Sequence, residues 1–281
     1  MFLCNVEIWS SKILFMKKIS WISGLVILFA LSGCFDTVDE LTFAENGSGT
    51  YVNTLDMGKM LGLAKTMGSG NDEMKELDKL KMDTLVYLKD IKDSLKKLSD
   101  AEKKIAATGT LKIQINANDE KLNFTFSFPF SKPSEIGPIQ NVLKKAKQDA
   151  LNNIMQKAMG EDANKNEGMF DKDAGDEEGE GMTPTVDEYY NTVYEKGKIS
   201  RKLNKEKYAH VEEDKSLKSL QEMAQMGMAI NMKTVINLPK PAKKAEGKGV
   251  KLSEDKKKIT MEGTLDDFFE DASYFEYNIE Y

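Results

Sequence analysis

Few side chains in this chain have the types and spacing that a catalytic centre requires. The one histidine, His210, lies among charged residues, namely Glu206, Lys207, Glu212 and Glu213. Such surroundings are typical of a solvated histidine rather than of a general base. With two cysteines and no second histidine, the chain lacks the usual pairs of nucleophile and base. We therefore assign no catalytic residue from the sequence.

Motifs that bind phosphate groups and metal ions are incomplete. Gly47-Ser48-Gly49 lacks the hydrolase pattern G-x-S-x-G, and Gly247-Lys248-Gly249 lacks the third glycine and the Lys-Ser/Thr ending of a phosphate loop. Asp171-Lys172-Asp173 resembles the start of a calcium loop, but Asp176 and Met182 stand where that loop needs Gly and Glu. Loose attraction of divalent cations by the acidic run is the alternative.

Two further charged features carry no recognised motif. Asp266 and Asp267 are adjacent and point apart, so we expect them to be negative charge at the N-terminus of a helix. Arg201 is the only arginine among 40 basic residues, which excludes a phosphate clamp built from several arginine forks. The sequence predicts no metal site and no cofactor.

The clearest chemical signal is a cysteine near the N-terminus. Leu31-Ser32-Gly33-Cys34 resembles the lipobox of bacterial lipoproteins, in which cleavage before the cysteine leaves a diacylglyceryl group on its sulfur. In front of it, Lys17 and Lys18 form a basic segment. Residues 19–31 form an apolar segment of 13 residues, shorter than a membrane span of about 20 residues.

These features predict a lipoprotein signal peptide over residues 1–33, with translation starting at Met16, and lipidation of Cys34. The alternatives are an uncleaved anchor, or an ordinary secretory signal with a cysteine there by chance. Acyl chains such as palmitate add about 0.8 kcal/mol of membrane affinity per buried methylene, so two or three make the attachment effectively permanent. Because Phe35, not Asp, follows the cysteine, the resemblance implies the outer membrane of the cell envelope.

The composition indicates a folded domain behind this anchor. The chain has 281 residues, 40% of them hydrophobic, and a net charge of -6. These values are ordinary for a globular protein, and the negative charge together with export argues against nucleic acid as a partner. Residues 34–48 are mostly polar, so we expect a lipidated tether there and a folded domain over 49–281.

The clearest structural pattern is a β-hairpin. Apolar residues alternate with polar ones in two segments separated by Asn118-Asp119, and these are Leu111, Ile113 and Ile115, then Leu122, Phe124, Phe126, Phe128 and Phe130. Such alternation predicts two antiparallel strands with one apolar face and one face toward water. The phenylalanines either form the main core or line a cavity for an apolar ligand.

Helices are expected beside this hairpin. Apolar residues over 134–159 recur at helical spacing and suit a long helix that covers the sheet. A shorter stripe from Met57 to Met67 predicts a helix whose methionines fill the core or face a ligand. Residues 84–88 are expected to form a strand, and Ser99 with Glu102 predicts a capping box at the start of a helix through Ile105.

The second half repeats these patterns. Strands are expected over 186–194, 199–203 and 231–238, a helix over 217–228, a hairpin from 250–252 and 258–261, a turn or helix over 265–269, and a last strand to Tyr281. In that last strand the aromatic residues should be buried. Residues 161–181 are acidic and glycine-rich and predict a disordered loop. The whole predicts an α+β fold, with antiparallel sheets covered by amphipathic helices in a single domain.

A lysine-rich stretch stands out within this acidic protein. Residues 240–258 contain eight lysines and three acidic residues. Lysines near a bilayer bind anionic headgroups, each adding about 1 kcal/mol. The alternative is a solvated hairpin whose lysines prevent pairing between sheet edges.

A family resemblance extends over most of the mature chain. The lipobox, the segments Glu45–Tyr51 and Asp83–Tyr87, and the hairpin around Leu252–Lys256 resemble uncharacterised lipoproteins of Bacteroidota. The alternation of strands and helices is also similar to the LppM-type domain, a lipid-binding α+β module. The lipobox is the one recognised motif, so the resemblance carries over a role for Cys34 alone.

Two functional hypotheses follow. The first is a membrane-anchored, non-enzymatic envelope lipoprotein that binds an apolar ligand or a partner protein. The second is an envelope enzyme that uses a carboxylate or a lysine in a cavity. Convergent ionisable groups with shifted pKa values would favour the enzyme, whereas a filled core would favour binding or structure.

Overall fold

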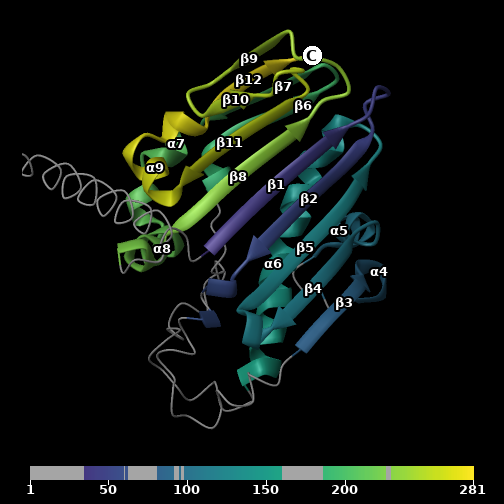
Figure 1. Ribbon diagram of the computed structural model, residues 1–281, viewed down its shortest axis with the longest axis vertical. Coiled ribbons are helices and arrows are strands. Elements are labelled where there is room, and N and C mark those ends of the chain that lie inside the picture. The colour runs from purple at the N-terminus through teal and green to yellow at the C-terminus, as the bar shows by residue number, and fades with distance from the viewer. Residues whose placement is uncertain are drawn as a thin grey trace, which may run out of the picture. The chain divides into compact units, whose positions relative to one another are not determined.

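The computed structural model (Figure 1) describes residues 35–59, 61–62, 81–91, 95, 98–159, 186–225 and 229–281. The predicted signal peptide 1–33, Cys34, most of the helix expected from Met57, and the acidic loop 161–181 lie outside the described residues. Within the described residues, no helix has the length and hydrophobicity of a membrane span.

The described residues form an α+β fold, as expected, with more residues in strands than in helices. The strands are β1 (Phe35–Phe43), β2 (Gly49–Asp56), β3 (Lys81–Tyr87), β4 (Thr110–Asn116), β5 (Lys121–Phe130), β6 (Tyr190–Glu195), β7 (Lys198–Leu203), β8 (Ile230–Asn237), β9 (Lys244–Glu246), β10 (Val250–Leu252), β11 (Lys258–Thr264) and β12 (Tyr277–Glu280). The helices are α4 (Leu88–Ile91), α5 (Asp100–Ala106), α6 (Ile136–Met159), α7 (Lys205–Tyr208), α8 (Lys215–Gln225) and α9 (Leu265–Glu270).

The strands form two sheets. The larger has eight strands in the order β10-β11-β8-β1-β2-β5-β4-β3, and the smaller has four in the order β6-β7-β12-β9. Among the described strands, every pairing is antiparallel except that of β1 with β8. These two strands run parallel, with Asp39 opposite Thr234. The expectation of purely antiparallel sheets is therefore wrong at this pair.

The tether expected over 34–48 is also wrong for most of its length. Residues 35–43 form β1, an inner strand of the larger sheet that pairs with β2 on one side and β8 on the other. The tether is predicted because this segment contains many polar residues. A polar segment can nevertheless be an inner strand when neighbouring strands pair with it on both sides. The first described residue, Phe35, is thus already part of the larger sheet.

The predicted hairpin is confirmed as β4 and β5, whose phenylalanines are all buried, Phe126 to 1% exposure. They belong to a core cluster that includes Ile136, Ile139 and Val142 of α6. The opposite parity of β4 and β5 carries Lys112, Gln114, Thr125 and other polar side chains. The alternation therefore corresponds to one face packed in the core and one face toward water.

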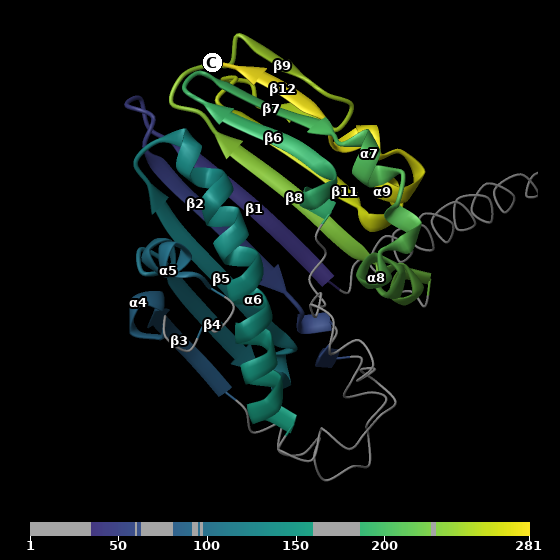
Figure 2. The same cartoon turned by 180° about the vertical axis from the view of Figure 1, so that it is seen from behind.

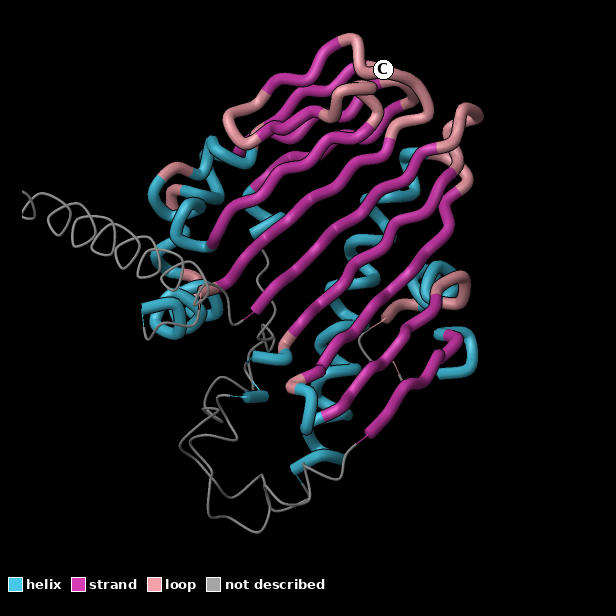
Figure 3. The backbone as a smooth tube through the Cα atoms, in the orientation of Figure 1, coloured by secondary structure: helices cyan, strands magenta, loops and turns pink. Residues whose placement is uncertain are grey.

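The helix α6 and the smaller sheet lie on the same face of the larger sheet (Figure 2). In that view α6 crosses the region of β2, β5 and β4, while β6 and β7 lie in front of β8 and β11. Figure 3 shows the strands of the larger sheet from the other side, where no described helix crosses its central strands. The inner face of β1 consequently lies between α6 and the smaller sheet.

Sequence signals at the starts of helices are confirmed in both halves of the chain. The capping box of Ser99 and Glu102 is present at α5, and Thr264 and Asp267 form a second one at α9, where Asp266 adds negative charge in the first turn. The last strand pairs with β7 and β9, and Tyr277 and Ile279 on it are buried.

The core position of the β5 phenylalanines predicts a large mutational effect. Phe126→Ala should lower the free energy of unfolding by about 3–5 kcal/mol, because it removes a fully packed ring and leaves a cavity. Leu85→Ala is a matched control, since Leu85 on the edge strand β3 is 53% exposed and should change the value by less than about 0.5 kcal/mol. Urea unfolding followed by circular dichroism measures both, and equal effects would contradict the packing described.

Candidate functional site

A polar cavity of about 750 Å³ lies among α6, the centre of the larger sheet and the smaller sheet. Its floor is formed by inward-facing residues of β1, β2 and β8. One wall comes from α6, and the other comes from the turn Val186–Tyr189 together with β6 and β7. The charged and polar side chains that line it include Thr37, Asp39, Tyr51, Asn53, Lys144, Lys147, Asp187, Glu188, Tyr190, Thr192, Arg201 and Thr234.

The floor of the cavity is centred on Asp39. On β1 this residue has the same parity as the buried Leu41 and Phe43, so its side chain points to the core face. The Tyr51 hydroxyl and the Asn53 Nδ2 atom both donate to Asp39 Oδ1, the second at 2.7 Å. A carboxylate is thus held by two neutral donors on the floor of the cavity.

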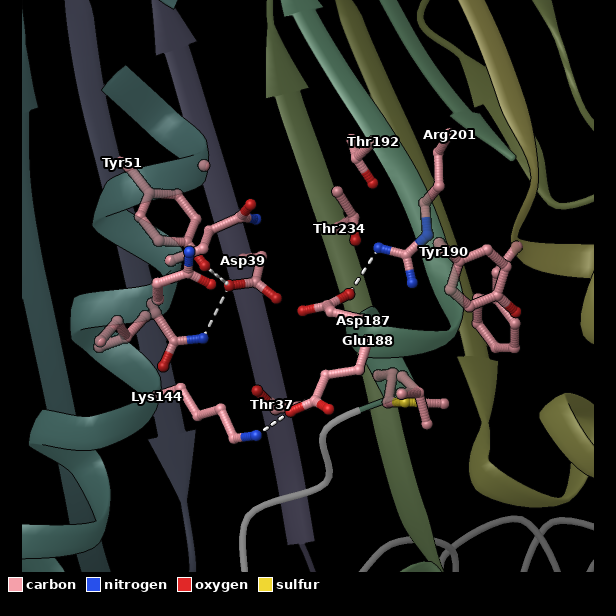
Figure 4. A pocket seen from close by; sticks show the side chains of 18 of the residues that line it. Thr37, Asp39, Tyr51, Lys144, Asp187, Glu188, Tyr190, Thr192, Arg201 and Thr234 are labelled. Carbon is pink, nitrogen blue, oxygen red and sulfur yellow. Dashed lines mark hydrogen bonds and ion pairs between the residues drawn. The ribbon is translucent and has the colours of Figure 1, made fainter. Parts of the chain in front are cut away.

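Burial raises the pKa of Asp39, and the negative charge of Asp187 raises it further. Lys147 and the hydrogen bonds from Tyr51 and Asn53 act in the opposite direction. Figure 4 shows Asp39 and Asp187 on facing sides of the cavity. The two carboxylates therefore repel each other across the space that a ligand would occupy.

Lys147 supplies positive charge from α6. Burial lowers the pKa of its amine, while the charges of Asp39 and Asp187 counteract part of that shift. A lysine whose ammonium is disfavoured and a carboxyl whose ionisation is disfavoured thus line one cavity. Both shifts move the pKa of the group toward neutrality.

The opposite wall holds Arg201, the one arginine of the chain. The residue is 8% exposed, its Nη1 atom donates to Asp187 Oδ1 at 2.5 Å, and its guanidinium lies 4.0 Å from the centre of the Tyr190 ring. Burial opposes the charge of Arg201, but Asp187, Tyr277 and Tyr190 together outweigh this effect and raise the pKa of the guanidinium. The Tyr190 hydroxyl donates to the Ala272 carbonyl at 2.6 Å, which fixes the ring under the guanidinium.

Two buried polar atoms at the site have no hydrogen-bond partner among the described residues. They are Asn53 Oδ1 and Arg201 Nε. An unpaired buried polar atom costs about 1–3 kcal/mol, so this part of the molecule is not arranged for maximum stability. Departures of this kind gather at functional sites.

Ion pairs surround the cavity at its rim. Lys144 pairs with Glu188, and Lys145 Nζ lies 2.7 Å from Glu102 Oε1. The hydrogen bonds of Glu102 with Lys145 and Ser99 lower its pKa to about 2. Both pairs link α6 to a neighbouring element, so they fix the helix that carries Lys147.

The sequence-derived candidates lie mostly elsewhere. His210 is exposed and lies 3.1 Å from Glu213, and it does not line the cavity. None of the β5 phenylalanines lines it either, which supports the core interpretation of that face, and Met57 is buried in the core cluster. Cys34, the assigned lipidation site, is outside the described residues.

Sequence reasoning missed Asp39, Lys147, Asp187 and Arg201. One signal for Asp39 was present, because Thr37, Asp39, Leu41 and Phe43 alternate as a strand does. Nothing in the spacing of the four charged residues indicates that they meet.

The described residues contain no group of three or more His, Cys, Asp or Glu side chains that could hold a metal ion. Comparisons with protein-family models, with curated proteins and with solved structures found no match to this chain. The chemistry of the cavity is therefore the basis for a functional assignment.

The coupling of Asp39 to Lys147 predicts a measurable shift. Lys147→Met should raise the pKa of Asp39 further, because it removes a positive charge that favours the carboxylate. With the folded-state pKa above the unfolded value of about 3.9, the folded state binds the extra proton, so stability falls as pH rises between the two values. In Lys147→Met the pH range over which stability falls should extend to higher pH.

Carbon-13 NMR titration of the Asp39 carboxyl, with urea unfolding at each pH, measures both effects. Lys251→Met is the control, because Lys251 pairs with Glu262 at 3.1 Å and does not line the cavity. An unchanged Asp39 titration in Lys147→Met would show that the two groups are not coupled.

Proposed function

We propose that this chain is an envelope lipoprotein, anchored through Cys34, whose domain binds a small polar ligand in the cavity beside Asp39 and Arg201. The observation that carries the binding function is the convergence of Asp39, Lys147, Asp187 and Arg201 on one cavity. The lipobox carries the anchor and the outer-membrane location. The fold that serves this function is a single α+β domain in which amphipathic helices cover the sheets.

The size and the energetic cost of the cavity support a binding site. Its volume of about 750 Å³ lies within the range of about 300–1,000 Å³ usual for ligand sites. Burying charged groups costs several kcal/mol per ion unless each is well paired, and apolar residues in their place are often neutral or stabilising. Charges retained around a cavity are thus better explained by a ligand than by stability.

The lining favours a polar ligand over the apolar ligand expected from the phenylalanine pattern. Carboxylates and cations face each other, and the hydroxyls of Thr37, Thr192 and Thr234 lie among them. Such a lining can donate and accept hydrogen bonds and can pair with a positive or a negative group of a ligand. A small hydroxylated or zwitterionic molecule meets these requirements.

An envelope enzyme is the second candidate, and one observation favours it. Asp39 has a raised pKa and Lys147 a lowered pKa within the same cavity. A protonated carboxyl and a neutral amine are the forms that act as general acid and general base near neutral pH. Release of an altered ligand by the purified chain, lost in Asp39→Asn, would select the enzyme over the binding protein.

The anchor is tested at the N-terminus of the chain purified from its native membrane. We expect mass spectrometry to find Cys34 as the first residue, carrying a diacylglyceryl group, and residues 1–33 removed. Cys34→Ser should keep the precursor intact and unlipidated. An unmodified Cys34 in the mature wild-type protein would refute the lipid anchor.

Ligand binding is tested by native mass spectrometry of the lipidated chain released from its membrane in mild detergent. We expect a bound small molecule in the wild type, and at least a tenfold lower occupancy in Asp39→Asn, which deletes the charge but keeps an oxygen for Tyr51 and Asn53. The same variant should unfold at a higher urea concentration, because the charge of a partly buried carboxylate is removed.

Lys251→Gln is the matched control, because it removes one charge outside the cavity lining. Its occupancy should equal that of the wild type. Occupancy that is equal in wild type and Asp39→Asn, or no bound molecule in any sample, would contradict the binding site.

A further inference from the structure

The position of β1 bears on how the domain meets the membrane, and this inference rests on the proposed lipidation of Cys34. We propose that the end of the larger sheet where β1 starts, flanked by α8 and α9, lies against the lipid headgroups. The lysine-rich turn between β10 and β11 then faces away from the bilayer.

No spacer separates the anchor from the fold. Phe35 is the first residue of β1, and it follows Cys34 through one peptide bond, which places consecutive Cα atoms about 3.8 Å apart. β1 is hydrogen-bonded on both sides, to β2 and to β8. The start of the strand therefore cannot leave the sheet to serve as a tether, and it must remain at the depth of the lipidated cysteine.

The strand registers identify the elements at this end. Phe35 pairs with Ile230, the first residue of β8, which follows α8 in the chain. Asn231 pairs in turn with Thr264, the last residue of β11 and the N-cap of α9. Figure 1 shows α8 beside the start of β8, at the same end as the start of β1. These two helices thus flank the point of attachment.

The lysine-rich turn lies at the other end of the same strands. Lys258 pairs with Asn237, and Asn237 pairs with Thr42 near the end of β1. The nine residues of β1 span about 30 Å at about 3.3 Å each. This exceeds the Debye length of about 8 Å at physiological salt, so Lys256 and Lys257 do not attract headgroups beneath the anchor.

Other lysines of the stretch already have acidic partners. Lys244 Nζ lies 2.9 Å from Glu246 Oε2, Lys248 Nζ lies 2.7 Å from Asp271 Oδ2, and Lys251 pairs with Glu262. Their charge is partly compensated within the domain. Of the two interpretations of residues 240–258, the solvated hairpin is therefore favoured over headgroup binding.

This orientation brings the cavity near the bilayer. Thr37 and Asp39 of its floor are three and five residues beyond Cys34 in the sequence. Along an extended strand this corresponds to about 10–17 Å. The proposed site is thus close to molecules at the membrane surface.

Single-cysteine variants test the orientation, because lipidation consumes Cys34 and the only other cysteine precedes it. Ser219→Cys on α8 and Glu254→Cys in the β10–β11 turn both place the thiol at exposed positions. Each lipidated chain is labelled with an environment-sensitive fluorophore and reconstituted in phosphatidylcholine vesicles containing headgroup spin-labelled lipid. Mass spectrometry first verifies the lipid on Cys34.

We expect the spin label to quench the fluorophore at position 219 at least threefold more strongly than the one at 254. The same pattern should hold when anionic phosphatidylglycerol is added. Equal quenching at both positions, or stronger quenching at 254 in either vesicle, would overturn the orientation. Because lipidation is verified on the same sample, loss of the anchor would be recognised separately as failure of the proposed function.

Discussion

The pairing of β1 with β8 is the interaction on which the rest of the structure depends. The paired residues of the two strands are 195 positions apart in the sequence, yet the strands run parallel in register from Phe35 to Thr42. This pairing joins the sheet strands of the first half, β2 to β5, to those of the second half, β8, β10 and β11. Without it neither half would present a floor to the cavity, because that floor is made of residues from both.

The energetic arrangement around that pairing is uneven. Apolar side chains of the hairpin and α6 close one region of the inner face, where burial of apolar surface stabilises the fold. At the centre, Asp39 and Arg201 remain, and each must be hydrogen-bonded because desolvation disfavours its charge. The apolar core on both sides of the cavity thus stabilises the fold, whereas the charged residues of the cavity do not. This is expected where residues are selected for function rather than for stability.

The lipid anchor that we propose at Cys34 would also constrain the domain, because it would be joined directly to an inner strand. A polar tether would let the domain rotate freely above the membrane, whereas β1 begins at Phe35 and transmits its direction to the whole sheet. In this proposal the cavity beside Asp39, whose floor includes the same strand, would have a defined height above the membrane surface. One strand would then carry both the anchor and part of the cavity floor.

The sequence by itself determined the local structure of this protein. Alternation of apolar residues fixed β4 and β5 with the face that Phe126 occupies, and helical spacing fixed α6, because both depend on neighbours in the chain. Tertiary structure alone decided that residues 35–43 are an inner strand and that Asp39 and Arg201 line the same cavity. Those outcomes depend on contacts between residues far apart in sequence, and no local pattern records which distant strand will cover a polar segment.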